Sequence, residues 1–242
     1  MNNTEDTLMR HKKKLIFSLV SLIVIVSAFV GGSFAYFTDK VETTNVIVAG
    51  SVSIKQHETD RNGVKSTSSY ITMVPAVTTD TTTEEKVING NKYNFNTYKN
   101  IIDKVVTVEN NGRNDVYVRT IIAIPEINDR NLVGIINNTA DIDWLKLEDV
   151  DILGKEHTLY VATYKNKLSS GEKSAPSLMQ VYLSPHTLSA DLATVPEGKI
   201  RMHIVSQAVQ CAGFEDESAL TAFAEGYGDI TRYNHPFEDV TV

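Results

Sequence analysis

The strongest constraint on this chain is its N-terminus, where three lysines precede a largely apolar run. Lys12, Lys13 and Lys14 are followed by apolar residues from 15 to 30, two glycines, and the small residues Ser33 and Ala35. This pattern predicts a signal peptide, residues 1–35, that is cleaved between Ala35 and Tyr36. The run is shorter than the ~20 residues that span a bilayer. The alternative is an uncleaved anchor, in which the helix lengthens through residues 31–36.

Two short motifs after this run carry a family resemblance. Residues 35–39 (AYFTD), a polar spacer and residues 48–54 (VAGSVSI) resemble the N-terminus of the camelysin/TasA family. This chain has Ser51-Val52 where the family usually has Thr-Leu. The resemblance implies an exported protein of a Gram-positive bacterium, processed by a dedicated signal peptidase, with a β-sandwich fold. Residues 36–242 are then expected to form a single domain.

Composition agrees with an exported globular domain. Residues 1–35 hold four of the 23 Lys/Arg and two of the 30 Asp/Glu, so the remainder has a net charge of −9. Such a charge argues against nucleic acid as a partner. Cys211 is the only cysteine, which excludes an intramolecular disulfide, and its apolar surroundings in sequence predict a buried side chain.

Short alternating segments separated by Asn-Gly and Ser-Gly turns predict an all-β fold. The fold class expected is an antiparallel, jelly-roll-like β-sandwich with one short helix, preceded by the N-terminal signal helix. The predicted strands are residues 45–54, 70–77, 101–109, 115–125, 142–147, 158–164, 177–183 and 199–211. The last of these is apolar on both faces, which is typical of a central strand, with Val205, Ala208 and Val209 deep in the core. Its neighbour 158–164 is expected to return through the turn at 168–172 as a hairpin with 177–183, as the resemblance implies.

Three further segments are expected to differ from regular strands. The Thr- and Asn-rich residues 78–100 predict a polar surface loop or an extra hairpin around Asn89-Gly90. Residues 216–225 predict a helix with acids at its start, ended by Gly226, with Leu220, Phe223 and Tyr227 toward the sheet. The tail, residues 229–242, is polar and is expected to be loose.

The sequence contains no recognisable catalytic motif. None of the six histidines lies in H-E-x-x-H, and there is no G-x-S-x-G or phosphate-binding glycine loop. No catalytic, cofactor-binding or metal-ligating residue is therefore predicted, and no cofactor. Arg119, in the middle of a strand, is expected to pair with a carboxylate at the sheet edge. Trp144 is expected to be a core or rim anchor.

These observations favour a structural protein over an enzyme. The resemblance implies a secreted subunit of extracellular fibres, in the biofilm matrix or at the cell surface, that polymerises head-to-tail with copies of itself. The predicted donor strand, residues 36–48, would add to the sheet of the next subunit through Tyr36, Phe37, Thr38, Val41, Val46 and Val48. Its further partners are the signal peptidase and other matrix proteins or polysaccharide. The alternatives are a secreted camelysin-like metallopeptidase and a monomeric surface adhesion module.

Overall fold

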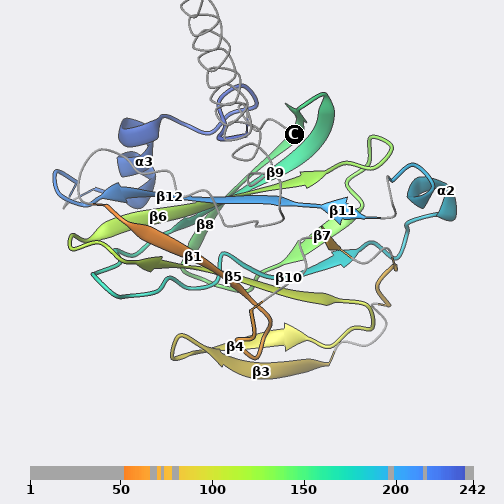
Figure 1. Cartoon of the computed structure of the whole chain (residues 1–242), viewed down its shortest axis with the longest axis horizontal. Helices are drawn as coiled ribbons and strands as arrows, with labels where there is room; N and C mark the ends of the chain where they lie inside the picture. Colours follow the sequence, from red (N-terminus) through yellow and green to blue (C-terminus); the bar gives the residue numbers. More distant parts are fainter. Residues whose placement is uncertain are drawn as a thin grey trace, which may run out of the picture. The chain divides into compact units, whose positions relative to one another are not determined.

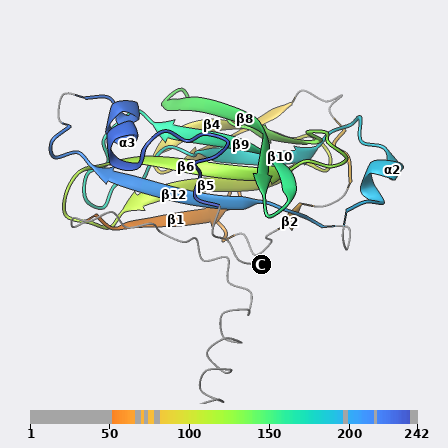
Figure 2. The same cartoon turned by 90° about the horizontal axis from the view of Figure 1, so that it is seen from above.

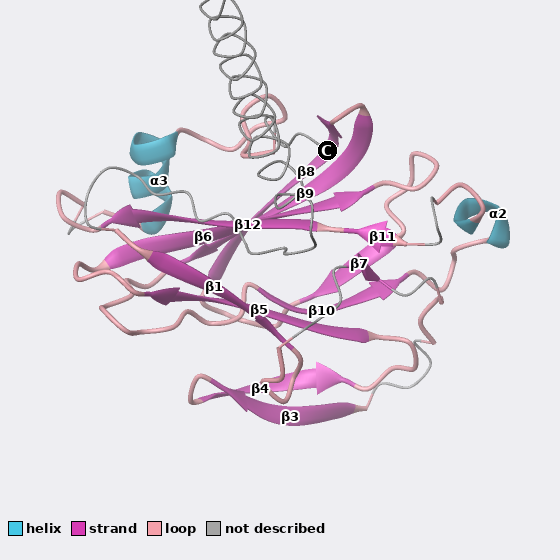
Figure 3. Cartoon of the chain, in the orientation of Figure 1, coloured by secondary structure: helices cyan, strands magenta, loops and turns pink. Residues whose placement is uncertain are grey.

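The computed structural model describes residues 52–65, 70–71, 74–77, 82–195, 199–214 and 217–237. The chain divides into two compact units, Met1–Glu42 and Thr43–Val242, and every described residue belongs to the second. Strands dominate it (Figure 3). Among the described residues no helix is long and apolar enough to cross a membrane. The predicted signal helix and its cleavage site lie outside the described residues. These two predictions and the jelly-roll connectivity are not tested and stay predictions.

Two four-stranded antiparallel sheets form the body of the domain (Figure 1). The first has the order β1-β5-β10-β7 and the second the order β12-β6-β9-β8. The strands of the first sheet are β1 (Ile54–Thr59), β5 (Ile102–Asn110), β7 (Val133–Ile136) and β10 (Leu178–Leu183). Those of the second are β6 (Val116–Pro125), β8 (Ile142–Ile152), β9 (Lys155–Tyr164) and β12 (His203–Gln210). The predicted all-β antiparallel class is confirmed.

The core lies between these two sheets, because each strand turns alternate residues toward the other sheet. Val106 and Leu178 of the first sheet share one buried cluster with Ile122 and Ile204 of the second. A second cluster joins Ile54 of β1 to residues of β5, β6 and β12. The two sheets therefore bury a common apolar layer along their length, and β6 is buried over nearly all of its residues because C-terminal parts of the chain also cover its outer face.

The Thr- and Asn-rich segment folds as a hairpin rather than a loop, so the second of its two predicted alternatives is the observed one. β3 (Thr83–Ile88) pairs with β4 (Asn91–Asn96) across Asn89 and Gly90, whose φ values are 49° and 84°. Positive φ at both central residues is the two-residue hairpin geometry that Asn-Gly favours. The hairpin lies beyond β5, on the side away from β12 and β6 (Figure 1).

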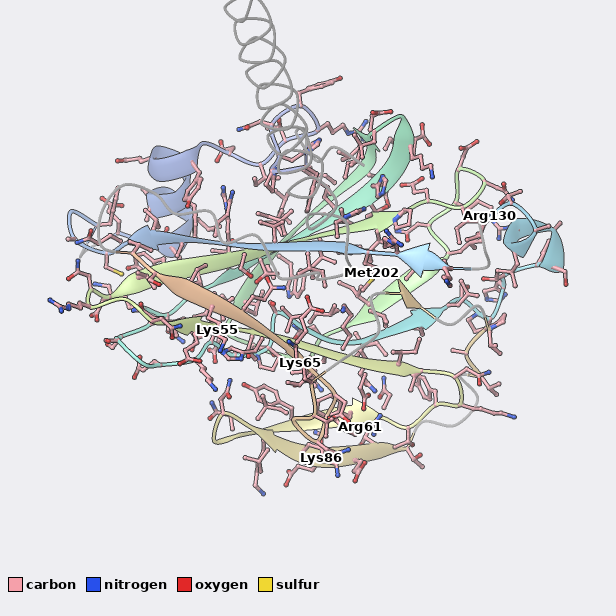
Figure 4. The ribbon with its side chains drawn as sticks, in the orientation of Figure 1. Lys55, Arg61, Lys65, Lys86, Arg130 and Met202 are labelled. Atoms are coloured by element: carbon pink, nitrogen blue, oxygen red, sulfur yellow. The ribbon has the colours of Figure 1, made fainter. Side chains whose placement is uncertain are left out.

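One buried phenylalanine attaches this hairpin to the first sheet. Phe95 is 0% exposed and packs with Ile88, Val105 and Met179. Arg61, in the turn after β1, lies with its guanidinium carbon 5.3 Å from the centre of the Phe95 ring (Figure 4). Its Nη2 donates to Asp103 Oδ1 at 2.8 Å and its Nη1 to Glu84 Oε2 at 3.2 Å. Apolar packing and an ion-pair network thus both attach the hairpin to the first sheet.

Short elements complete the domain. β2 (Tyr70–Ile71) pairs with β11 (Ile200–Arg201), so the strand predicted over residues 70–77 is much shorter. Two helices are described rather than the one expected: α2 (Ser189–Leu192) and α3 (Ala219–Tyr227). They lie at opposite ends of the sheets in two perpendicular views (Figures 1 and 2). α3 begins after Ser218, whose side chain accepts from the Thr221 N–H, and its C-cap is Gly228.

Three predictions about the helix and the strands are wrong. Gly226 lies inside α3, and Leu220 is 52% exposed, whereas Ala219, Ala222 and Phe223 are buried. β9 and β10 belong to different sheets, so residues 158–183 do not form a hairpin. β12 is the edge, not the centre, of its sheet among the described residues, and Val205 is half-buried while Ala208 and Val209 are buried. Of the predicted strand 45–54 only residues 52–54 are described, and β1 runs from Ile54 to Thr59.

The C-terminal segment is anchored rather than loose as far as Phe237. We call residues 229–237 the C-terminal strap. Ile230 and Phe237 are buried with Ile121 and Leu159, which face outward from the second sheet. A tight turn between Thr231 and Asn234 shapes the strap. The strap therefore covers the outer face of the second sheet, although its composition is polar.

Candidate functional site

The residues predicted from the sequence to act in processing and assembly lie outside the described residues. These are the cleavage pair Ala35 and Tyr36 and the donor-strand residues Phe37, Thr38, Val41, Val46 and Val48. What the structure describes instead is the place where such a segment enters the domain. The described part begins at Val52, directly before β1, and Val52 is buried with Ile54.

The edge of β12 is the first component of this site. Along β12 the backbone groups of alternate residues point to β6 and away from it, as in any antiparallel pair. Cys211 N–H donates to the Asp115 carbonyl at the end of the ladder, so the odd-numbered residues face β6. The backbone groups of Ile204, Ser206 and Ala208 then point away from β6. Among the described residues no strand pairs with them.

Both ends of this edge are covered, which leaves a short open window. At one end, β2 pairs with β11, which continues into β12 after Met202. At the other end, the Tyr227 hydroxyl of α3 donates to the Ala208 carbonyl at 3.1 Å. The remaining open backbone belongs to Ile204 and Ser206.

The edge of β1 is the second component of the site. It lies beside the edge of β12, and we call the line where these two edges meet the seam. Asn111 N–H and Gly112 N–H both donate to the Ser53 carbonyl, so the backbone groups of Ile54 and Gln56 point away from β5 by the same alternation. Side chains link the two edges: Ser206 Oγ donates to Gln56 Oε1 at 2.6 Å and lies 3.1 Å from Thr120 Oγ1. These buried side-chain hydrogen bonds therefore hold β1 and β12 beside each other. The outward backbone groups of the two strands pair with no other strand among the described residues.

Arg119 supports the helix that covers the end of β12. Its guanidinium lies 4.5 Å from the centre of the Phe223 ring and 5.3 Å from that of Tyr227, and its Nε donates to Gln207 Oε1 at 2.7 Å. Burial lowers the pKa of Arg119 to about 10, although the nearby Tyr227 and Asp229 act to raise it. Among the described residues the contacts of the Arg119 guanidinium are two aromatic rings and an amide, and no ion pair with a carboxylate is found there.

Trp144 lies on β8, the opposite edge of the second sheet. It is 40% exposed, which agrees with a rim position rather than the core. Cys211 is buried, as predicted.

The histidines do not assemble a metal site with three ligands among the described residues. Five of the six are described; His57 lies 2.6 Å from Glu109, and His157 and His203 are neighbours with ring centres 6.2 Å apart. The group of three potential ligands found in the described part is Glu126, Asp149 and Glu156, with no histidine.

This carboxylate group is an exposed acidic surface to which we assign no metal. Desolvation, followed by repulsion from Asp129, Glu126, Asp149 and Asp151, raises the pKa of Glu156. A peptidase zinc requires histidine ligands and an open position, so three carboxylates do not fit that ion. Oxygen ligands suit harder cations, but an acidic cluster alone does not define a site.

Comparison with known families covers the N-terminal part of the chain. The model of the family described as camelysin metallo-endopeptidase matches residues 10–68. This segment is of the camelysin family. The resemblance predicted from residues 35–39 and 48–54 is thereby confirmed. The camelysin match ends at residue 68, past the end of β1, and leaves the rest of the domain unmatched. No curated protein and no solved structure matches the chain.

The sequence analysis did not predict the edges of β1 and β12 that could receive an added strand. The polarity of Thr120 and Ser206 within largely apolar strands was the available signal, because buried polar side chains in a core need partners, whereas Gln56 lies in a strand that is polar throughout and gives no such signal. The pairing of their strands, however, is not encoded in any local pattern.

Proposed function

We propose that the chain is a secreted structural subunit that assembles head-to-tail into extracellular fibres. Residues 36–48 of one subunit add as a strand to the open seam of the next subunit. The observation that carries this proposal is the short edge at Ile204 and Ser206, beside the edge of β1: in the described part of the chain neither edge pairs with another strand on its outer side. Unpaired edge backbone is a ready template for another strand, and natural proteins normally protect it.

The composition of the proposed donor segment suits that edge. Residues 36–48 contain β-branched and hydroxyl residues that favour an extended strand, with Tyr36 and Phe37 at the free end after cleavage. Main-chain hydrogen bonds would supply the affinity, and the apolar side chains would set the register. Since donor and acceptor are different surfaces of one molecule, the contact does not close on itself and propagates.

The family match supports export and processing. It covers residues 10–68, which include most of the predicted signal peptide, the cleavage pair and the donor segment. Proteins of the camelysin family are secreted. The matrix or the cell surface of a Gram-positive bacterium is then where fibres would form, with self, signal peptidase and matrix components as partners.

A camelysin-like metallo-endopeptidase is the second candidate, and the family's description favours it. Its chemistry would need a zinc ion with at least two nitrogen ligands and a water in the open position. In the described part of the chain, His157 and His203 are the one neighbouring histidine pair, and the group of three ligand atoms is entirely carboxylate. This donor set gives the fibre subunit the stronger support.

The test compares the mature protein that begins at Tyr36 with a protein that begins at Asn45. A matched control keeps the full length but scrambles the order of residues 36–44. We expect filaments by electron microscopy from the first protein, and monomers from the other two. Equally long filaments from the protein that begins at Asn45 would refute donor-strand addition by this segment. Hydrolysis of a casein substrate that is lost with a chelator would instead favour the peptidase.

A further inference from the structure

The C-terminal strap covers an apolar face that the fold would otherwise expose. Ile230 and Phe237, the latter 1% exposed, are the strap's buried apolar side chains. They pack on outward-facing residues of three strands of the second sheet, namely Ile121, Ala123, Val150, Ile152, Leu159 and Val161. Detachment of the strap would therefore uncover a continuous apolar surface over β6, β8 and β9.

Two histidines lie beside the strap's terminal phenylalanine, and a third lies beside one of them. The ring of Phe237 lies 6.2 Å from that of His203 on β12 and 6.2 Å from that of His235 on the strap itself. His157 on β9 lies next to His203, and its Nδ1 is 2.8 Å from the Lys155 carbonyl oxygen. His235 is buried, and its Nδ1 has no hydrogen-bond partner among the described residues.

The polar attachment of the strap to the sheet is weak in the described part of the chain. Arg232 Nη2 lies 3.3 Å from Asp149 Oδ2, and both side chains are about half exposed or more. Asp229 also attracts the buried guanidinium of Arg119 on β6. The strap's other hydrogen bonds are internal: Asn234 Nδ2 donates to the Asp229 carbonyl, and Thr231 N–H to the Asn234 carbonyl. The strap is thus a preformed turn whose two buried apolar side chains hold it on the sheet beside the histidines.

We propose that the C-terminal strap is an acid-released cover of the second sheet, whose detachment follows protonation of His157 and His203. In neutral solution residues 229–237 lie on the outer face of β6, β8 and β9. In mildly acid solution the two histidines become charged, the strap leaves, and the apolar face becomes accessible.

The electrostatic surroundings favour this direction. Burial is the main cause that lowers the pKa of both His157 and His203, and mutual repulsion lowers that of His203 further. A detached strap returns the histidines to water, where the ordinary pKa is about 6.5. The open form therefore binds protons more readily, so the closed form loses stability as the pH falls below about 6.5. The charged groups that act on the pair are Lys155, Asp151 and Glu126 around His157, of which the two carboxylates oppose the lowering of its pKa, and Arg201 beside His203.

The experiment is hydrogen exchange of the secreted protein at pH 7.5 and pH 5.0, corrected for intrinsic rates. An open-state pKa of about 6.5 permits up to about a 30-fold rise in strap opening per histidine at pH 5.0. We expect the protection of strap amides to fall at least tenfold, while the amides of β6 keep theirs. Unchanged strap protection, or an equal loss in β6, would overturn the proposal.

Variants separate the histidines from other acid effects. His157→Asn with His203→Asn should make strap protection independent of pH, whereas His186→Asn, an exposed position away from the strap, should leave the response intact. Persistence of the acid response in the double variant would overturn the proposal. Should the double variant not fold, Phe237→Ala serves instead: strap protection should already be low at pH 7.5 with β6 unaffected, and full strap protection in that variant would refute the role of Phe237.

Discussion

Replacement of Phe95 by alanine is the sharpest test of how the β3–β4 hairpin is held. The Phe95 ring is 0% exposed and packs on Val105 of β5 and Met179 of β10, so it is the buried link between the hairpin and the first sheet. Truncation of a buried phenylalanine costs about 3–5 kcal/mol, from lost apolar burial and the cavity left behind. The Arg61 guanidinium, 5.3 Å from the ring centre, also loses its aromatic neighbour, which adds about 0.5–1 kcal/mol.

The hairpin offers a matched control for this measurement. Val87 is on the same hairpin but 62% exposed, so Val87→Ala should change stability by less than about 0.5 kcal/mol. Urea denaturation of both variants gives the two free energies of unfolding, and hydrogen exchange of β3 and β4 shows whether the loss is local. We expect a loss of about 3.5–6 kcal/mol for Phe95→Ala, the sum of the two contributions. A loss below about 1.5 kcal/mol would show that the ion-pair network around Arg61, rather than the ring, attaches the hairpin.

Three further substitutions test other contacts by urea denaturation. Arg119→Lys removes the planar group that lies on Phe223 and Tyr227 and should cost about 2 kcal/mol, whereas the exposed Arg113→Lys should be neutral; equal effects would contradict the stacking role. Gly90→Ala should cost about 1 kcal/mol from backbone strain alone, because φ is 84° and no atom lies within 4 Å of the added Cβ; a stabilised variant would refute this. Gly134→Ala should cost about 1–3 kcal/mol because its Cβ would lie 2.3 Å from Tyr182 Cζ, and suppression of that loss by Tyr182→Ala would confirm the clash.

Local pattern predicted most of the strands but not their partners. Alternation located β5, β6, β9, β10 and β12 to within a few residues, since it reports which face of a strand is buried. It carries no information on the neighbouring strand, which is why residues 158–183 were expected to form a hairpin, although they cross from one sheet to the other.

The errors at the helix and the tail have specific causes. Gly226 was expected to end α3, but a Cβ there would lie 3.0 Å from Val209, so this glycine allows the helix to approach β12; the positive φ belongs to Gly228. Leu220 was chosen for its size, whereas the small Ala219 and Ala222 form the buried face. In the tail, two buried residues, Ile230 and Phe237, outweigh a polar composition. For the candidate site, the sequence supplied the donor segment, and only the sheet order supplied the edge that could receive it.

The bond between Gln56 of β1 and Ser206 of β12 joins residues 150 positions apart in the chain. Such distant pairings slow folding, because the chain must close a long loop before the contact forms. The seam is therefore among the last parts of the domain to be completed. A chain that is made N-terminus first cannot join β1 to β12 until β12 itself has followed. During that interval the edge of β6 that later pairs with β12 is exposed to other chains, so the time needed to complete the chain as far as β12 sets how long this edge is open to mispairing.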